Sequence, residues 1–215
     1  MANARCRVGR VITAAFAVLA GAGYAQPGNA GISIAVLALP SPQTGQATPE
    51  TRQLVEAIGD RLQARGFRVT IVGTTGFTPA EELTATVNAR AVDLVVSARS
   101  FAKARRCAAV IAPQPVSRPA EPKTAVGQAQ LGDFFRRLMA FARFEASTRL
   151  ASSLASVGEW CQPKPTEIER YVLQGLNAPT VLLGLASRDQ DRLIERLPSV
   201  VEGWTAEERK ERNLE

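Results

Sequence analysis

Two patterns of apolar and polar positions alternate along the chain, and they predict alternating strands and helices. Short, nearly continuous apolar runs bounded by Pro, Gly or polar residues are typical of strands buried in a sheet. Apolar residues recurring every three or four positions between these runs indicate amphipathic helices. Strands are therefore expected at residues 32–39, 67–72, within 87–100, at 107–112, as a short strand or extended turn at 171–173, and at 180–186.

The expected helices carry recognisable start and stop signals. Thr48 is placed as an N-cap with Pro49 at the first helical position, and Gly66 is expected to end that helix as a C-cap. A second Thr-Pro pair opens a helix at Thr78. The remaining helices are expected from 128 to 144 with a continuation through 154, and from about 189 to 203, with a kink at Pro198.

Strands alternating with helices predict an α/β fold, here a single three-layer domain with a mostly parallel central sheet of about five to six strands. The domain is expected to span residues 32–205, after a flexible leader at 26–31. Residues 113–127 form a Pro-rich loop inside it, because four prolines between 113 and 123 prevent regular structure. Residues 206–215 are expected to form a polar, frayed tail.

The first 25 residues have the organisation of a secretory signal peptide. Arg5, Arg7 and Arg10 form a basic region, an apolar run follows at 11–20, and small residues precede a cleavage point after Ala25. The apolar run is shorter than the roughly 20 residues that span a bilayer. We therefore expect a periplasmic or secreted protein with no stable membrane anchor after cleavage.

Composition and charge narrow the functional classes. The 46% hydrophobic and 21% charged residues are ordinary for a globular protein. Cleavage after Ala25 would remove three arginines and lower the net charge from +6 to +3, which suits an anionic cell wall. No basic stripe with interleaved aromatic residues indicates a nucleic-acid partner. Cys107 and Cys161 would be the cysteines of the mature chain, and in an oxidising compartment they either pair as a disulfide or stay buried.

One stretch carries a specific spacing: Asn88, four residues, Asp93, three apolar residues, Ser97, one residue and Arg99. Further motifs follow in order at residues 147–151 (Ser-Thr-Arg-Leu-Ala), 171–173 (Tyr-Val-Leu) and 179–183 (Pro-Thr-Val-Leu-Leu). Together they resemble the catalytic domain of the zinc-dependent N-acetylmuramoyl-L-alanine amidases, which cut peptidoglycan. The resemblance covers roughly residues 32–205.

The resemblance implies a zinc ion held by two histidines and a glutamate, with a further glutamate that moves the proton. This chain contains no histidine. Residues 37–42 offer no ligand at the first histidine position, and the second is occupied by Arg99. Pro49 stands at the glutamate-ligand position with Glu50 one residue away, and Gly184 stands at the catalytic glutamate position. The zinc expected for the family therefore has no ligand set, and no cofactor is predicted.

These residues lead first to an exported, non-catalytic protein of the cell envelope that binds peptidoglycan or regulates a cell-wall hydrolase. A further possibility is a purely structural partner of another envelope protein, bound through the apolar helix near Phe134 and Phe141. The alternative is an active amidase, or another peptidoglycan hydrolase, with a rebuilt site. No catalytic residue is assigned, and the candidate ligand-binding residues are Arg99, Glu50 and Ser97.

Several positions keep a structural interpretation beside the functional one. Arg99 either binds a carboxylate or phosphate of a wall fragment or is solvated or paired within the protein. Asp93 is expected to fix the turn before its strand, and Asn88 to act as a helix C-cap. The helix at 128–144 resembles the regulatory helix that covers the active site in some amidases, and it is equally consistent with a core helix.

Overall fold

A computed structural model of the chain describes residues 29, 31–41, 44–76, 79–100, 108–111, 117–120, 128–156, 160–161, 167–185 and 190–214. The proposed signal peptide and Cys107 lie outside these residues, as does most of the Pro-rich loop. The described strands are β1 (Ser33–Ala38), β2 (Arg68–Val72), β3 (Leu94–Ser100), β4 (Ala108–Ile111), β5 (Trp160–Cys161) and β6 (Thr180–Leu185), which form one sheet in the order β2-β1-β3-β6-β4-β5.

The centre of the sheet is parallel. β1 pairs with β2 and β3, and β3 pairs with β6, each in the parallel direction. β4 runs antiparallel to β6, and β5 is parallel to β4. The expected mostly parallel α/β fold is confirmed. Its continuous parallel part has four strands, fewer than the five to six expected, and the short strands β4 and β5 extend it at one edge.

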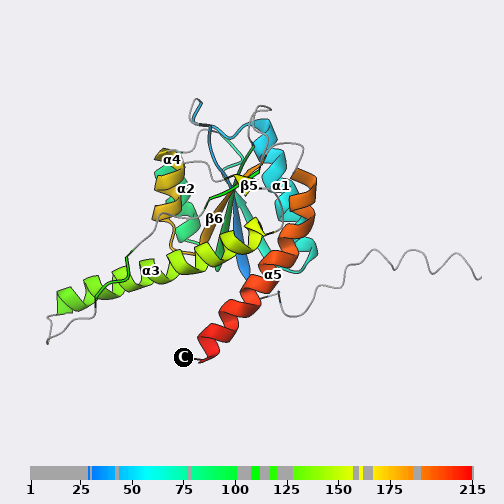
Figure 1. Cartoon of the computed structure of the whole chain (residues 1–215). Coiled ribbons are helices and arrows are strands. Elements are labelled where there is room, and N and C mark those ends of the chain that lie inside the picture. Colours follow the sequence, from blue (N-terminus) through cyan, green and yellow to red (C-terminus); the bar gives the residue numbers. More distant parts are fainter. Residues whose placement is uncertain are drawn as a thin grey trace, which may run out of the picture.

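Helices cover both faces of the sheet, as Figure 1 shows. On one face, α1 (Pro49–Ala64), the second half of α3 (Gln128–Ala155) and α5 (Gln190–Leu214) share a core cluster with the sheet. On the other face, α2 (Ala80–Asn88) and α4 (Glu167–Gly175) pack in a second cluster. This arrangement is the expected three-layer domain.

The central strand β1 shows why the chain folds into layers. Successive side chains of a strand point to opposite faces. Ile34 and Val36 accordingly lie in the cluster with α1 and α5, whereas Ala35 and Leu37 lie in the cluster with α2 and α4. All four are fully buried, so the strand reads as a continuous apolar run in the sequence.

The boundaries of α1 follow the expected capping signals. The Thr48 hydroxyl accepts a hydrogen bond from the Thr51 backbone N–H at 3.2 Å, and Pro49 begins the helix. The helix ends at Ala64, and Gly66 follows with a φ of +86°, a left-handed conformation that glycine adopts without strain. The start of this helix is therefore confirmed. The prediction of Gly66 as the C-cap is wrong by one residue, because the cap residue is Arg65 and Gly66 follows it.

Residues 171–173 were expected to be extended, and this prediction is wrong. They lie inside α4. Glu169, Val172 and Leu176 recur at three- and four-residue spacing and are all buried, whereas Tyr171 is exposed. This spacing places one face of a helix on the core. In the sequence, the run Tyr-Val-Leu is typical of an extended segment and hides this helical spacing.

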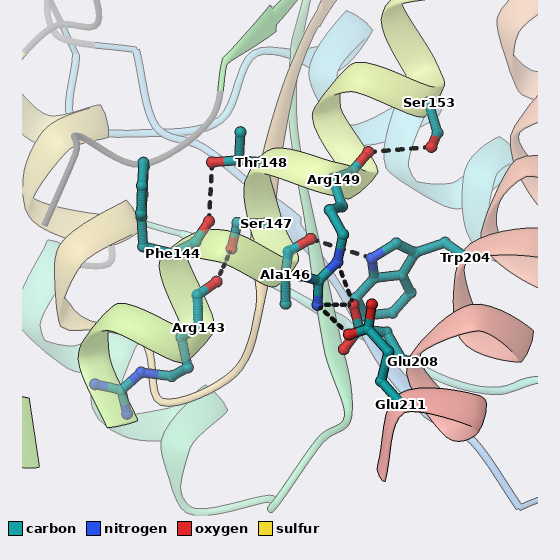
Figure 2. Close-up of polar contacts among 10 residues, drawn as sticks. All are labelled: Arg143, Phe144, Ala146, Ser147, Thr148, Arg149, Ser153, Trp204, Glu208 and Glu211. Carbon is teal, nitrogen blue, oxygen red and sulfur yellow. Dashed lines mark hydrogen bonds and ion pairs between the residues drawn. The ribbon is translucent and has the colours of Figure 1, made fainter. Parts of the chain in front are cut away.

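The expected frayed tail is also wrong, because α5 continues to Leu214. Figure 2 shows the contact that holds this extension: Arg149 of α3 donates to Glu208 through Nε at 3.0 Å and forms an ion pair with Glu211 at 3.0 Å. Burial lowers the pKa of Arg149, but its hydrogen bond to Glu208 and the nearby negative charges outweigh this effect and raise the pKa overall. A long-range ion pair thus joins the end of α5 to α3.

Candidate functional site

Three parallel strands end together at one edge of the sheet. The Leu39 N–H, just after β1, donates to the Ala98 carbonyl oxygen of β3 at 3.1 Å. Arg99 of β3 lies in register with Gly184 of β6. In open α/β sheets, ligands bind outside the carboxyl ends of the strands. We call this region the carboxyl edge, defined by residues 39–40, 49–51, 97–100 and 184–185.

The first turn of α1 is tied to this edge by a buried hydroxyl. The Ser100 backbone N–H donates to Thr51 Oγ1 at 3.1 Å, and the Thr51 and Thr48 hydroxyls are 3.1 Å apart. This contact places Glu50 next to the end of β3. The sequence positions singled out as Pro40, Glu50, Arg99 and Gly184 therefore converge on one edge, although the chain separates them by up to 144 residues.

Arg99 is held by a buried partner on α4. Its Nη1 lies 3.0 Å from Glu169 Oε1, and the two side chains are 16% and 2% exposed. An arginine paired with a carboxylate at this burial fixes α4 against β3 at the carboxyl edge. Of the two interpretations of Arg99, the structure supports the internally paired one.

At the carboxyl edge, Ser97 is buried and Glu50 is exposed. Ser97 is fully buried between Leu37 of β1 and Leu182 of β6, and its Oγ has no hydrogen-bond partner in the described part of the chain. Glu50 is exposed. A backbone hydrogen bond and a second one from the Thr48 hydroxyl lower the pKa of the Glu50 carboxyl. Glu50 is thus an accessible carboxylate at the helix N-terminus.

Asp93 and Asn88 act at the opposite end of the strands. Asp93 Oδ2 accepts from the Ser33 N–H at 2.8 Å, which fixes the turn before β3 as predicted. The prediction of Asn88 as a C-cap is wrong, because the cap residue of α2 is Ala89. The Asn88 side chain instead donates to the Gly175 carbonyl oxygen at 2.9 Å and accepts from the Asn177 N–H at 2.8 Å, which joins α2 to the end of α4.

The donor groups at the carboxyl edge do not fit a zinc ion. Zinc sites in proteins use imidazole, thiolate and carboxylate ligands, and the sequence has no imidazole. Within the described residues, no three His, Cys, Asp or Glu side chains are grouped so that they could hold a metal. At the position where the resemblance implies a histidine ligand, the Arg99 guanidinium is a permanent cation whose charge repels a metal ion.

Glu169 is the residue at this edge that the sequence did not reveal. Glu169 lies on α4 two residues before the segment 171–173 that the sequence pattern predicts to be extended, so this pattern does not place Glu169 on a buried helix face. The sequence does contain a sign of this position. Glu169, Val172 and Leu176 are spaced three and four residues apart, which is the spacing of one face of a helix, and all three are buried. A charged residue in phase with a buried apolar stripe is expected to have a charged partner, since an unpaired buried charge is strongly unfavourable.

Two hydrogen bonds join the helix α3 to the segment that leads into β6. Arg143 Nη1 donates to Asn177 Oδ1 at 3.4 Å, and the Ser147 hydroxyl accepts from the Thr180 N–H at 2.8 Å. Both partners lie at the amino end of β6. In Figure 1, α3 accordingly crosses the end of the sheet opposite to the start of α1.

Comparison with solved structures identifies the fold. An N-acetylmuramoyl-L-alanine amidase from Clostridium difficile 630 matches with a TM-score of 0.53 and 10% identity over 83% of this chain and 98% of that chain. The apo form of an N-acetylmuramyl-L-alanine amidase from Mycobacterium abscessus gives a TM-score of 0.52 and 14% identity, covering 82% and 99%. The catalytic domain of the amidase CwlV from Bacillus (Paenibacillus) polymyxa gives 0.50 and 10%, covering 81% and 98%.

The chain has the fold of an amidase catalytic domain. The similarity extends over nearly the whole of each of these three matched chains. No protein-family model and no curated protein matches the sequence, so the shared fold is recognised from the structure. Within the described residues, no helix is long and apolar enough to cross a membrane.

Proposed function

We propose that this chain is an exported protein of the cell envelope that binds peptidoglycan without cutting it, or regulates a wall hydrolase that does. The Arg99–Glu169 ion pair carries the proposal. It fills the carboxyl edge of an amidase fold with a guanidinium, at the position where the family resemblance implies a metal ligand.

Hydrolysis of an amide requires a group that activates water and a group that stabilises the developing oxyanion. The residues of the carboxyl edge are poorly suited to either role. The Arg99 guanidinium faces a buried carboxylate, which offsets the charge that would stabilise an oxyanion. A good general base has a pKa near the working pH. The pKa of Glu50 is lowered, so its carboxylate is a weak base.

Binding places fewer demands on the same edge. Glu50 is accessible beside strand ends that hold Arg99, and the mature chain would be positively charged overall. Peptidoglycan is a large anionic polymer with hydroxyl, amide and carboxylate groups, which a few hydrogen bonds from a rigid edge can recognise. The amidases that share the fold are named for an action on this kind of material.

Co-sedimentation with purified sacculi tests the proposal. The chain beginning at Gln26 should pellet with sacculi, and a protein of similar size and charge should stay in the supernatant. Glu50→Arg should lower retention at least threefold, because it removes a carboxylate that accepts hydrogen bonds from hydroxyl and amide groups of the polymer, even though it makes the chain more positive. Glu56→Arg makes the same change at an exposed position further along α1 and should leave retention unchanged.

Two results would overturn the proposal. One is retention no greater than that of the control protein. The other is release of peptide stems from the sacculi, which would favour the active hydrolase with a rebuilt site. If Glu50→Arg and Glu56→Arg change retention equally, binding does not depend on the position of the substitution and the carboxyl edge is not the binding site.

A further inference from the structure

The first half of α3 exposes large apolar side chains. Leu131, Phe135 and Met139 are 40%, 52% and 59% exposed, and their spacing of four residues puts them on one side of the helix. We call the segment from Leu131 to Arg143 the α3 arm. An exposed apolar stripe on a helix is unfavourable in water unless another surface covers it.

The apolar and the charged side chains of the α3 arm lie on different sides of the helix. With 100° of rotation per residue, its large apolar side chains fall within an arc of about 160°. That arc contains Leu131, Phe134, Phe135, Leu138, Met139 and Phe141. The three arginines of the arm lie outside the arc. Around the helix axis, Arg137 lies about 40° beyond one end of the arc, and Arg143 and Arg136 lie about 40° and 60° beyond the other end.

The arm projects from a firmly attached helix. The second half of α3 is held to α5 by the Arg149 ion pairs and by the Trp204 indole N–H, which donates to the Ala146 carbonyl oxygen at 3.1 Å (Figure 2). Ala146 and Leu150 are buried in the core. Among the described residues, Arg143 is the last one towards the amino end of α3 that has a hydrogen bond or ion pair with another part of the chain. Figure 1 shows the arm extending past the body of the protein.

The charges of the arm indicate what covers its apolar face. Arg136 and Arg137 are 79% and 70% exposed, and both pair with Asp133 on the polar side. Three arginines and one aspartate give the arm a net charge of +2. Arginine side chains at the borders of an apolar face can extend upward to lipid headgroups while that face enters the acyl region. Phe and Leu on one face with arginine on the other is the composition of a helix that lies on a membrane surface.

A second copy of the chain fits this face less well. The exposed parts of three side chains amount to apolar area on the order of 300 Å². A stable protein interface buries about 800 Å² on each partner. Two arms packed together would also bring the arginines of both copies to the same borders, where their charges repel.

We propose that the α3 arm binds the surface of an anionic phospholipid bilayer, with its axis in the plane of the headgroups. This binding needs no membrane-spanning segment. The arm and the carboxyl edge lie at opposite ends of the strands, so lipid binding and peptidoglycan binding use separate surfaces (Figure 1).

Vesicle co-sedimentation tests this proposal with the chain beginning at Gln26, which retains every described residue and lacks the apolar segment 11–20. The chain should pellet with vesicles of phosphatidylcholine and phosphatidylglycerol, and it should remain soluble with phosphatidylcholine alone. Replacing Leu131, Phe135 and Met139 together with Gln should lower the partition coefficient at least tenfold. Tyr171→Gln is the matched control, because Tyr171 is 47% exposed on α4 and its loss should change nothing.

A second variant tests the electrostatic part of the proposal. Arg136→Gln with Arg137→Gln should weaken binding about tenfold in low salt, since each basic residue near an anionic surface contributes an attraction that salt screens. Circular dichroism of each variant verifies that the domain is folded.

Equal binding by the triple Gln variant would overturn the proposal, as would equal binding to both vesicle types. A wild-type dimer that the triple Gln variant converts to a monomer would instead assign the face to self-association. None of these results depends on sacculus retention, so the peptidoglycan proposal stands or fails separately.

Discussion

Glu169→Gln tests the ion pair at the carboxyl edge. The substitution keeps the size and shape of the side chain and removes its charge. Arg99 is then left 16% exposed, 3.0 Å from a neutral amide. The wild-type pair joins α4 to β3, so the cost of losing the charge should appear in the stability of the whole domain.

The expected cost follows from burial. Removing one partner of a buried ion pair costs about 3–5 kcal/mol, because the other charge stays buried without compensation. Arg99 retains some exposure to water, so we expect about 3 kcal/mol for Glu169→Gln. For a domain of this size, that loss lowers the melting temperature by roughly 6–12 °C.

Urea unfolding followed by circular dichroism measures this loss. A double-mutant cycle adds Arg99→Met, Glu169→Leu and the double variant, which replaces the pair by apolar side chains of similar volume. The double variant should be within about 1 kcal/mol of the wild type, because an apolar pair can substitute for a buried ion pair. Additive losses in the cycle, or a change below about 0.5 kcal/mol for Glu169→Gln, would refute the pairing argument.

Three further substitutions examine other contacts. Trp204→Phe removes the indole hydrogen bond to the Ala146 carbonyl oxygen and part of a buried ring, so urea unfolding should show a loss of about 2 kcal/mol. Ala91→Gly should stabilise the protein by about 0.5 kcal/mol in the same assay, because Ala91 has a φ of +45°. Glu50→Gln should change the pH dependence of stability. The lowered pKa of Glu50 stabilises the folded state above its ordinary value of 4.5, and this contribution is lost as the pH falls through the lowered pKa. The stability difference between wild type and Glu50→Gln should therefore shrink on acidification below pH 4.5, and a constant difference would contradict the assignment.

The layers of the fold could be predicted because their signals are local. Apolar runs such as β1 and β6 are buried on both faces, and the Thr48–Pro49 pair marks a helix start through its own backbone. The polar end of α5 could not be predicted in this way. Its Glu208 and Glu211 contact Arg149, about 60 residues away, and such a partner is invisible in a local pattern.

The candidate site was predictable only in part for the same reason. The strand ends that carry Ser97, Arg99 and Gly184 were expected at one edge, since parallel strands place their carboxyl ends together. The partner of Arg99 was not expected, because Glu169 comes from a helix on the outer layer. The absence of histidine is apparent from the sequence, but the carboxylate that pairs with Arg99 is apparent only in the structure.

The central claim is that this amidase fold recognises the cell wall and does not cleave it. The most direct test is to incubate the chain beginning at Gln26 with purified sacculi in the presence of added zinc, and to quantify released peptide stems by mass spectrometry. The account predicts no stems above the buffer control while the protein remains with the sacculi. Stems released in proportion to protein concentration, and absent for Arg99→Met with Glu50→Gln, would contradict it.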